Sequence, residues 1–394
     1  MHLSLCIIVK NEELLLPQCL SSVADVVDEI VVLDTGSTDR TIEIAQQFDA
    51  KVHNFTWCND FSAARNKALK YVTGDWILVL DADETLTPSI VPQLLQAIKS
   101  DSHLLINLVR DEVGAEQSPY SLVSRLFRNH PDISFSRPYH ALVDDSVSLI
   151  ITREPHWQIG YLPDVAILHE GYQKQAIAHH NKFAKAQAAM EGFLATHPTD
   201  PYVCSKLGAL YIESGKITQG IELLQRGLAS NPSDQILYEL HYHLGIACTQ
   251  TGNFDQARHH YHAATQLPIY PMLKIGAYNN LGSLLKASGD LPAALAAYTT
   301  TLEIDPNFAV GHYNRGMTLK ALGLFNDAIA SYGRALDLKP NYAEAYQNLG
   351  VVLLKIGKIQ DSLTAFDRAL VLHEQNNPAE AQRLRQGLQE MGFG

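Results

Sequence analysis

The C-terminal half of this chain repeats itself, and the repeat restricts its possible folds more than any other feature. Glycines recur at intervals of 37, 37, 34 and 34 residues, and each is followed seven residues later by a second glycine. Because the region has a helical pattern throughout, a period near 34 residues predicts stacked helix pairs, none of which can bury its apolar face alone. The first series is Gly208, Gly245, Gly282, Gly316 and Gly350, and the second is Gly215, Gly252, Gly289, Gly323 and Gly357.

The fourth unit explains why these residue types recur. Small side chains at Gly316 and Ala328 let two antiparallel helices approach closely, and Tyr332 fills the space between them. Gly323 is expected to end the first helix, because the turn there needs a left-handed backbone. Pro340 is expected to stop the second helix.

These landmarks resemble the tetratricopeptide (TPR) repeat, and five units agree in register. We expect an all-α solenoid over residues 196–376, then a capping helix or tail over 377–394 after the break at Asn376, Asn377 and Pro378. The resemblance implies a concave groove for a protein or peptide partner. An exposed flank of the array could also mediate a homodimer.

Residues 1–195 have a different sequence pattern, in which short apolar runs alternate with helical segments. A connecting helix is expected at the end of this region. This alternation, with short loops, predicts an α/β domain with a mostly parallel sheet. Later strands are expected at 104–110, 121–127 and 165–168. The earlier strands are expected at 3–9, 29–33, 51–55 and 76–80, and the helices at 14–23, 40–48 and 62–72.

The composition of the chain limits its possible partners and its cellular compartment. A formal net charge of −12 argues against a nucleic-acid partner, and five cysteines without a C-x-x-C pair favour a reducing compartment. The apolar N-terminal run is short and meets Lys10, so we expect a first strand and not a signal peptide. No run approaches the roughly 20 apolar residues of a transmembrane segment, and a cytoplasmic location is expected.

The first candidate site residue is Asp34, which ends a buried run and precedes a glycine-bearing turn. Ligands of open α/β sheets bind at the carboxyl ends of strands, where Asp34 can accept hydrogen bonds from a base or ribose. A helix is expected to begin near Thr38, with Thr38 or Asp39 as its cap. The absence of a G-x-G-x-x-G motif disfavours a nicotinamide site.

The second candidate is the run Asp81-Ala82-Asp83, which follows an apolar strand. Residues two apart on an extended chain point the same way, so both carboxylates are expected to converge. They would repel unless a cation such as Mg²⁺ or Mn²⁺ lay between them and bridged to a diphosphate. Acidic residues are also common turn formers after strands. With Asp34, the two acids are expected to surround one pocket.

Four segments in order, 8–13, 34–39, 61–66 and 81–84, resemble family 2 glycosyltransferases of the GT-A fold. The resemblance implies transfer of a sugar from a nucleotide-diphospho-sugar donor. Asp34 would contact the base or ribose, Asp81 the ribose side and Asp83 the metal. A late histidine, His169, is the candidate second metal ligand. The implied nucleotide-sugar-binding residues are Val9, Asn11, Glu12, Asp34, Arg65, Asn66, Asp81 and Ala82.

The chain departs from the family pattern at His140, because Ala141 stands where related sequences carry a glutamate that is attractive as the general base. The base role then falls to His140, Asp144 or Asp145, or activity is lost. With Asp83, His140 is our catalytic assignment. In the strand before it, Arg125 or Arg128 either faces the diphosphate or is an exposed basic residue.

Together these features predict an inverting, metal-dependent glycosyltransferase that transfers a hexosyl or N-acetylhexosaminyl group to an acceptor. A protein or peptide bound by the TPR groove is the candidate acceptor. One alternative is a catalytically inactive, nucleotide-sugar-binding TPR scaffold, which Ala141 favours. A nucleotidyltransferase is disfavoured, because residues 9–12 replace the Gly-rich phosphate loop expected there.

Overall fold

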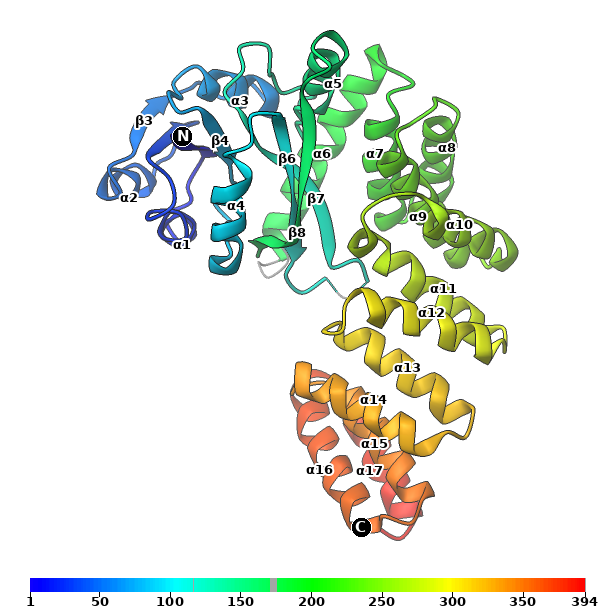
Figure 1. Ribbon diagram of the computed structural model, residues 1–394. Helices are drawn as coiled ribbons and strands as arrows, with labels where there is room; N and C mark the ends of the chain where they lie inside the picture. The colour runs from blue at the N-terminus through cyan, green and yellow to red at the C-terminus, as the bar shows by residue number, and fades with distance from the viewer. Residues whose placement is uncertain (116, 171–175, 394) are drawn as a thin grey trace. The chain divides into compact units, whose positions relative to one another are not determined.

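The computed structural model describes residues 1–115, 117–170 and 176–393, with side chains for all of these except 176–182 (Figure 1). Contacts divide the chain into two compact units, Met1–Asn231 and Pro232–Gly394, which are described separately. Within the described residues, no helix has both the length and the apolar character needed to cross a bilayer.

An eight-stranded mixed sheet forms the N-terminal domain, in the order β3-β2-β1-β4-β7-β6-β8-β5. The first four strands in this order are parallel, as expected, whereas β7 runs antiparallel to both β4 and β6. β8 is parallel to β6 and antiparallel to β5. The strands are β1 (Leu3–Val9), β2 (Glu29–Asp34), β3 (Lys51–Asn54), β4 (Trp76–Val79), β5 (Glu84–Leu86), β6 (His103–Glu112), β7 (Tyr120–Arg128) and β8 (Gln158–His169).

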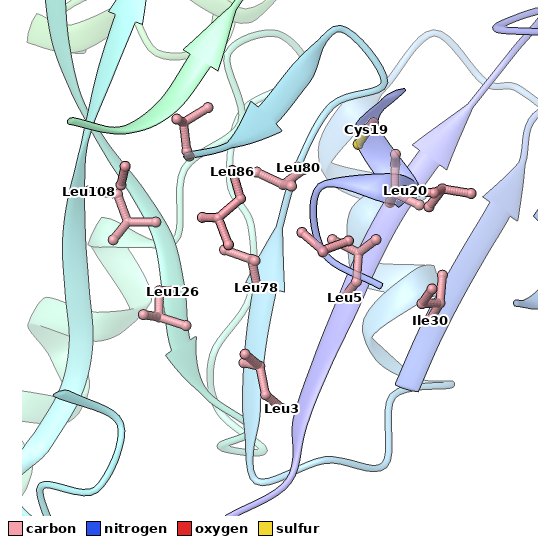
Figure 2. Close-up of a cluster of buried hydrophobic side chains, with 14 of the residues drawn as sticks. Leu3, Leu5, Cys19, Leu20, Ile30, Leu78, Leu80, Leu86, Leu108 and Leu126 are labelled. Atoms are coloured by element: carbon pink, nitrogen blue, oxygen red, sulfur yellow. The ribbon is translucent and has the colours of Figure 1, made fainter. Parts of the chain in front are cut away.

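Helices cover both faces of this sheet. Residues of α1, α2 and α4 pack against one face in a large apolar cluster (Figure 2), and residues of α3 and α5 pack against the other. Because β1 is buried on both sides, its sequence is almost continuously apolar instead of alternating. The helices are α1 (Leu16–Ser21), α2 (Thr41–Gln47), α3 (Phe61–Leu69), η1 (Pro88–Ile90), α4 (Val91–Ala97) and α5 (Asp144–Arg153).

The rest of the described chain is helical. α6 (Ala176–Thr196) precedes five helix pairs, of which the first belongs to the N-terminal compact unit and the other four to the C-terminal one. The pairs are α7 (Pro201–Glu213) with α8 (Ile217–Leu228), α9 (Asp234–Gln250) with α10 (Phe254–Gln266), α11 (Ile275–Ala287) with α12 (Leu291–Ile304), α13 (Ala309–Ala321) with α14 (Phe325–Leu338), and α15 (Ala343–Lys355) with α16 (Ile359–Asn376).

The two glycine series do what the sequence predicted. A Cβ at Gly316 would lie 2.7 Å from the Tyr332 ring, so only glycine lets α13 and α14 meet there. Every glycine of the second series has a positive φ, between 74° and 87°, at the end of the first helix of its pair. α14 ends at Leu338, just before Pro340.

The structure also shows where the two 37-residue units gain their extra residues and how the chain continues after the last pair. One 37-residue unit has a longer first helix, α9, and the next contains the 3₁₀ turn η3 (Pro271–Lys274). After Asn377, where the sequence predicted a capping helix or tail, α17 (Pro378–Glu390) buries Leu384 and Leu388 against Phe366. The Asn377 side chain accepts a hydrogen bond from the Glu380 amide and caps α17.

Candidate functional site

Asp34 shapes the turn that follows β2. Its carboxylate accepts hydrogen bonds from the amide of Gly36 at 3.0 Å and from the amide of Ser37 at 3.1 Å, and the residue is buried. Across the parallel pair, Val9 is in register with Asp34, and the Val9 carbonyl accepts from the Thr35 amide at 2.9 Å. The Asp34 carboxylate therefore holds the loop after β2 in place. This loop lies at the strand end where the sequence analysis predicted contact with the base or ribose of a ligand.

The loop after β1 is fastened to the loop after β2. Asn11 has a left-handed φ of 56°, and its side-chain oxygen accepts a hydrogen bond from the Thr38 amide at 2.7 Å. The Glu12 amide donates to Thr41 Oγ1 at 2.7 Å. α2 begins at Thr41, three residues after Thr38 and one after the start of the predicted segment 40–48, and the Asp39 carboxylate accepts from the Thr41 amide at 3.0 Å.

Asp81 is held between two guanidinium groups. Arg65 Nη2 donates to one carboxylate oxygen at 2.7 Å and Arg125 Nη2 to the other at 2.8 Å. Burial by itself raises the pKa of Asp81, but the positive charges of Arg125 and Arg65 outweigh it and hold the pKa well below its usual range. Asp81 is therefore ionised, and each of its two carboxylate oxygens accepts a hydrogen bond from an arginine.

A turn explains why the two acids separate. β4 ends at Val79, and the Glu84 amide donates to the Asp81 carbonyl at 3.0 Å, so the chain folds back through Ala82 and Asp83. The alternation of side chains along an extended strand does not continue through a turn. Ala82 itself is buried in the apolar cluster on one face of the sheet.

Arg125 and Ser124 lie at an irregularity in the β6–β7 pairing. The register shifts between Ile106 and Leu108, so Asn107 lies opposite both Ser124 and Arg125. Such a bulge turns two consecutive side chains toward the same face of a sheet. Arg125 contacts Asp81, and Ser124 Oγ donates to an oxygen of Asp144 at 2.9 Å.

Asp83 faces His169, as the sequence proposed. The Asp83 Oδ2 and His169 Nε2 atoms are 3.5 Å apart, and His169 Nδ1 lies 2.6 Å from Glu112 Oε2. Burial lowers the pKa of His169, but its hydrogen bonds with Asp83 and Glu112 raise it to about 9. Conversely, burial raises the pKa of Glu112, but His169 and Arg110 lower it to about 2.

Two acids at this edge were missed by the sequence analysis as site residues. Glu84 is fully buried and accepts from Arg110 Nη1 at 2.7 Å, and Glu112 pairs in register with His169 across β6 and β8. Glu84 directly follows the acidic run, which is a usable signal. No motif marks Glu112, because its place depends on a long-range strand pairing.

The result is a charge-balanced network at one edge of the sheet. Four carboxylates face three guanidinium groups and one imidazole, and each member lies within 4 Å of an opposite group. In the described part of the chain, no three acidic, histidine or cysteine side chains are grouped so as to hold a metal ion by themselves. The members are Asp81, Asp83, Glu84, Glu112, Arg65, Arg110, Arg125 and His169.

Asn66 and Arg128 stabilise the surrounding fold. The Asn66 side chain forms two hydrogen bonds with the backbone of Phe135, at 2.7 and 2.9 Å, and so buttresses the following loop. Arg128 lies opposite Trp76 at the start of β4 and donates to the Ser100 and His103 carbonyls. Because the acidic network lies at the other end of β4, Arg125 is the arginine of this pair that belongs to the site.

The loop with His140 is anchored on both sides. Arg137 pairs with Asp145 at 2.6 Å and with Asp200, the N-cap of α7, at 2.8 Å. His140 is exposed and has a φ of 52°, and Arg137 has a φ of 73°. Two left-handed non-glycine residues in one short loop are unusual, and such strain concentrates at functional sites.

Asp144 is the acid of this region with spare bonding capacity. Ser124 holds its Oδ1, while no described residue hydrogen-bonds to its buried Oδ2. Burial raises the pKa of Asp144. By contrast, Asp145 is exposed and its Oδ2 accepts from both Arg137 and Ser136.

Comparisons with known proteins agree with this architecture. Residues 4–160 match the family described as Glycosyl transferase family 2, and residues 178–241, 275–308, 318–357 and 363–386 match tetratricopeptide repeat families. A TPR repeat-containing protein of Synechococcus elongatus is 44% identical over 297 residues, which cover 75% of this chain and 74% of that protein.

Two further proteins are similar to a smaller part of this chain. The SPbeta prophage-derived glycosyltransferase SunS of Bacillus subtilis is 35% identical over 138 residues, 34% of this chain and 33% of SunS. YrrB, whose structure is described as that of a TPR protein with an unusual peptide-binding site, is 16% identical with a TM-score of 0.42, over 51% of this chain and 100% of YrrB.

The family matches define a glycosyltransferase domain joined to tetratricopeptide repeats. The chain belongs to the family 2 glycosyltransferases of the GT-A fold that are fused to tetratricopeptide repeats.

Proposed function

We propose that this chain is an inverting glycosyltransferase that moves a sugar from a nucleotide-diphospho-sugar to an acceptor, and that its donor site is the carboxyl edge of the sheet. The observation that carries the proposal is the Asp83–His169 pair, with Asp83 Oδ2 and His169 Nε2 3.5 Å apart and Glu112 behind the imidazole. Asp34 and the backbone near Val9 would lie along the base and ribose of the donor, with Asn11, Glu12, Arg65 and Asn66 fixing the loops around it.

The donor atoms of this pair fit a divalent cation. A carboxylate and an imidazole at this separation can share one ion, and a carboxylate on the far ring nitrogen is the usual support of a metal-bound histidine. Asp83 and His169 would hold the ion, and an imidazole ligand is more usual for Mn²⁺ than for Mg²⁺. When bound, the ion would neutralise the charge that develops on the leaving diphosphate.

The residues of the chain would then perform the transfer as follows. A base removes the proton of the acceptor, whose atom attacks the anomeric carbon from the face opposite the diphosphate. The new bond to the acceptor forms as the bond to the phosphate oxygen breaks, and the diphosphate leaves with the electron pair. Asp81 keeps Arg65 and Arg125 in place and thereby preserves the charge balance of the edge.

The direct test is turnover of the Asp83→Ala variant. With a sugar donor that the wild-type chain hydrolyses or transfers, we expect a loss of roughly a thousandfold, about 4 kcal/mol of barrier. A control variant, Asp337→Ala, removes an exposed acid of α14 in the repeats and should lose far less. Full activity of Asp83→Ala, or full activity after chelation of metal, would contradict the site assignment.

Of the three candidate bases, we propose Asp144. Its Oδ2 has no partner among the described residues, and a raised carboxyl pKa makes a stronger base than a solvated carboxylate. Asp144→Asn should lower kcat by about 100-fold to 10,000-fold while leaving donor binding intact. If His140→Ala loses activity and Asp144→Asn does not, the base is the histidine instead.

A second candidate function is a catalytically inactive, nucleotide-sugar-binding scaffold. Ala141, half-buried against the core where related sequences carry a glutamate, favours it. The two functions differ in one measurement, because a scaffold would bind a donor sugar by calorimetry but would neither hydrolyse nor transfer it.

A further inference from the structure

Two histidines of the second helix pair face each other across the two helices. His241 lies on α9 and His260 on α10, and their Nδ1 atoms are 3.0 Å apart. The centroids of the two imidazole rings are 5.2 Å apart, the ring planes are inclined by 41°, and both residues are half-buried. Both helices belong to the C-terminal compact unit, so the pair is a feature of that unit alone.

The repeat fold does not account for this pair. His241 stands four residues before Gly245, and His260 stands one residue before Tyr261, whose ring packs on that glycine. Helix packing in the other units is built without a histidine at the second of these positions. The residues there are Leu223, Ala297, Ser331 and Ala365, and those at the first position are Cys204, Tyr278, His312 and Tyr346.

Both imidazoles are in the form that binds metal. Burial, followed by the charge of His259, lowers the pKa of His241. Burial, followed by the charges of His241 and His259, lowers the pKa of His260 to about 4. Both rings are therefore neutral at pH 7, and a neutral imidazole has one ring nitrogen with a lone pair that a metal ion can accept.

The separation of the two nitrogens fits one shared ion. Nitrogen ligands lie about 2.0–2.1 Å from Zn²⁺, which puts two of them about 2.9 Å apart at a right angle and about 3.3 Å apart at the tetrahedral angle. The 3.0 Å between the Nδ1 atoms lies between these values. Binding requires that the proton on one Nδ1 move to Nε2 of the same ring, after which both Nδ1 lone pairs can point to the ion.

We propose that His241 and His260 form a binding site for a transition-metal ion such as Zn²⁺, which links α9 to α10 through the two Nδ1 atoms. Imidazole suits Zn²⁺, Cu²⁺ and Ni²⁺, whereas Mg²⁺ and Ca²⁺ prefer oxygen ligands. In the part of the chain that the structure describes, no third acidic, histidine or cysteine side chain completes a metal-binding group, so water would fill the remaining positions. The site does not depend on sugar transfer.

Isothermal titration of the full chain with Zn²⁺ tests the pair. The titration uses the Asp83→Ala variant, which removes the acid proposed to hold a cation at the sheet edge. We expect saturable binding of Zn²⁺ but not of Mg²⁺. The affinity should fall by roughly tenfold or more when His241→Gln or His260→Gln is added, since even the loss of an outer partner of a metal ligand costs about tenfold.

His262→Gln is the matched control, because it removes an exposed imidazole from the same helix, α10, and should leave the affinity unchanged. Nitrogen NMR spectra of the histidine rings identify the ligand atoms. On addition of Zn²⁺, the Nδ1 resonances of His241 and His260, assigned from the two glutamine variants, should shift together.

Three outcomes would overturn the proposal. One is the absence of saturable Zn²⁺ binding. Another is an unchanged affinity in both His241→Gln and His260→Gln, with folding of both variants verified by circular dichroism. The third is a loss of affinity in His262→Gln equal to that in His260→Gln, which would place the ion among the exposed histidines of α10 and not between the two helices.

Discussion

Asp81 and Asp83 stand two residues apart and face different partners. Asp81 is bound by Arg65 and Arg125, whereas Asp83 faces His169. The sequence located both acids at the carboxyl edge of the sheet, but their orientation depends on the turn that follows β4. At the scale of single residues, the type of side chain was predictable and its direction was not.

Glu29 is a buried carboxylate whose ionised form is stabilised by several hydrogen bonds. Its carboxylate accepts hydrogen bonds from Lys51, Ser4 and Thr73 at 2.5–2.9 Å. Burial raises the pKa of Glu29, but these hydrogen bonds outweigh it and lower the pKa to about 2. A depressed folded-state pKa stabilises the protein above the unfolded pKa, and that stability is lost as pH falls toward the folded value.

We therefore predict that Glu29→Gln lowers the free energy of unfolding by about 2 kcal/mol at pH 7. The deficit should shrink to less than half at pH 3, between the unfolded pKa of about 4.5 and the folded value of about 2. Urea denaturation at both pH values measures it, with Asp25→Asn, an exposed acid before β2, as control. An equal or larger deficit at pH 3 would contradict this origin of the stability.

At the scale of elements, local patterns were sufficient for most of the fold. The apolar run at 3–9 and the strand predicted at 29–33 correspond to β1 and β2. They could be predicted because parallel strands that are buried on both faces consist of nearly continuous apolar residues. β5 was missed, since three residues cannot show a period. The true lengths of β6 and β8, and the bulge opposite Asn107, depend on pairing between distant segments.

The repeats were predictable in more detail, because each landmark has a local steric cause. Gly316→Ala tests that cause: the new Cβ would lie 2.7–2.8 Å from the Tyr332 ring, and we expect a loss of about 1–3 kcal/mol. Gly333→Ala is the matched control, because nothing lies within 4 Å of its Cβ, and it should stabilise α14 by up to about 1 kcal/mol. Urea midpoints followed by circular dichroism compare the two, and equal shifts would refute the steric explanation.

At the scale of the whole molecule, the chain combines an α/β domain with helical repeats. The sheet edge gathers balanced charges around Asp83 and His169, and the repeats form a stack of helix pairs. The family assignment followed from four short segments and five repeats, all visible in the sequence. Glu84 could have been found from its place directly after the acidic run, whereas Glu112 could not, because it reaches the site through the long-range pairing of β6 with β8.

Isothermal titration of the full chain with UDP-, GDP- and dTDP-sugars, in Mn²⁺ and in chelator, tests the central claim most directly. Wild-type protein should bind at least one donor in Mn²⁺ and lose most of that affinity in chelator, and Asp83→Ala should behave as wild type does without metal. Asp337→Ala, an exposed acid on α14, should bind as wild type does. If no donor binds, or if binding is equal with and without metal and in Asp83→Ala, the carboxyl edge of the sheet is not a nucleotide-sugar site.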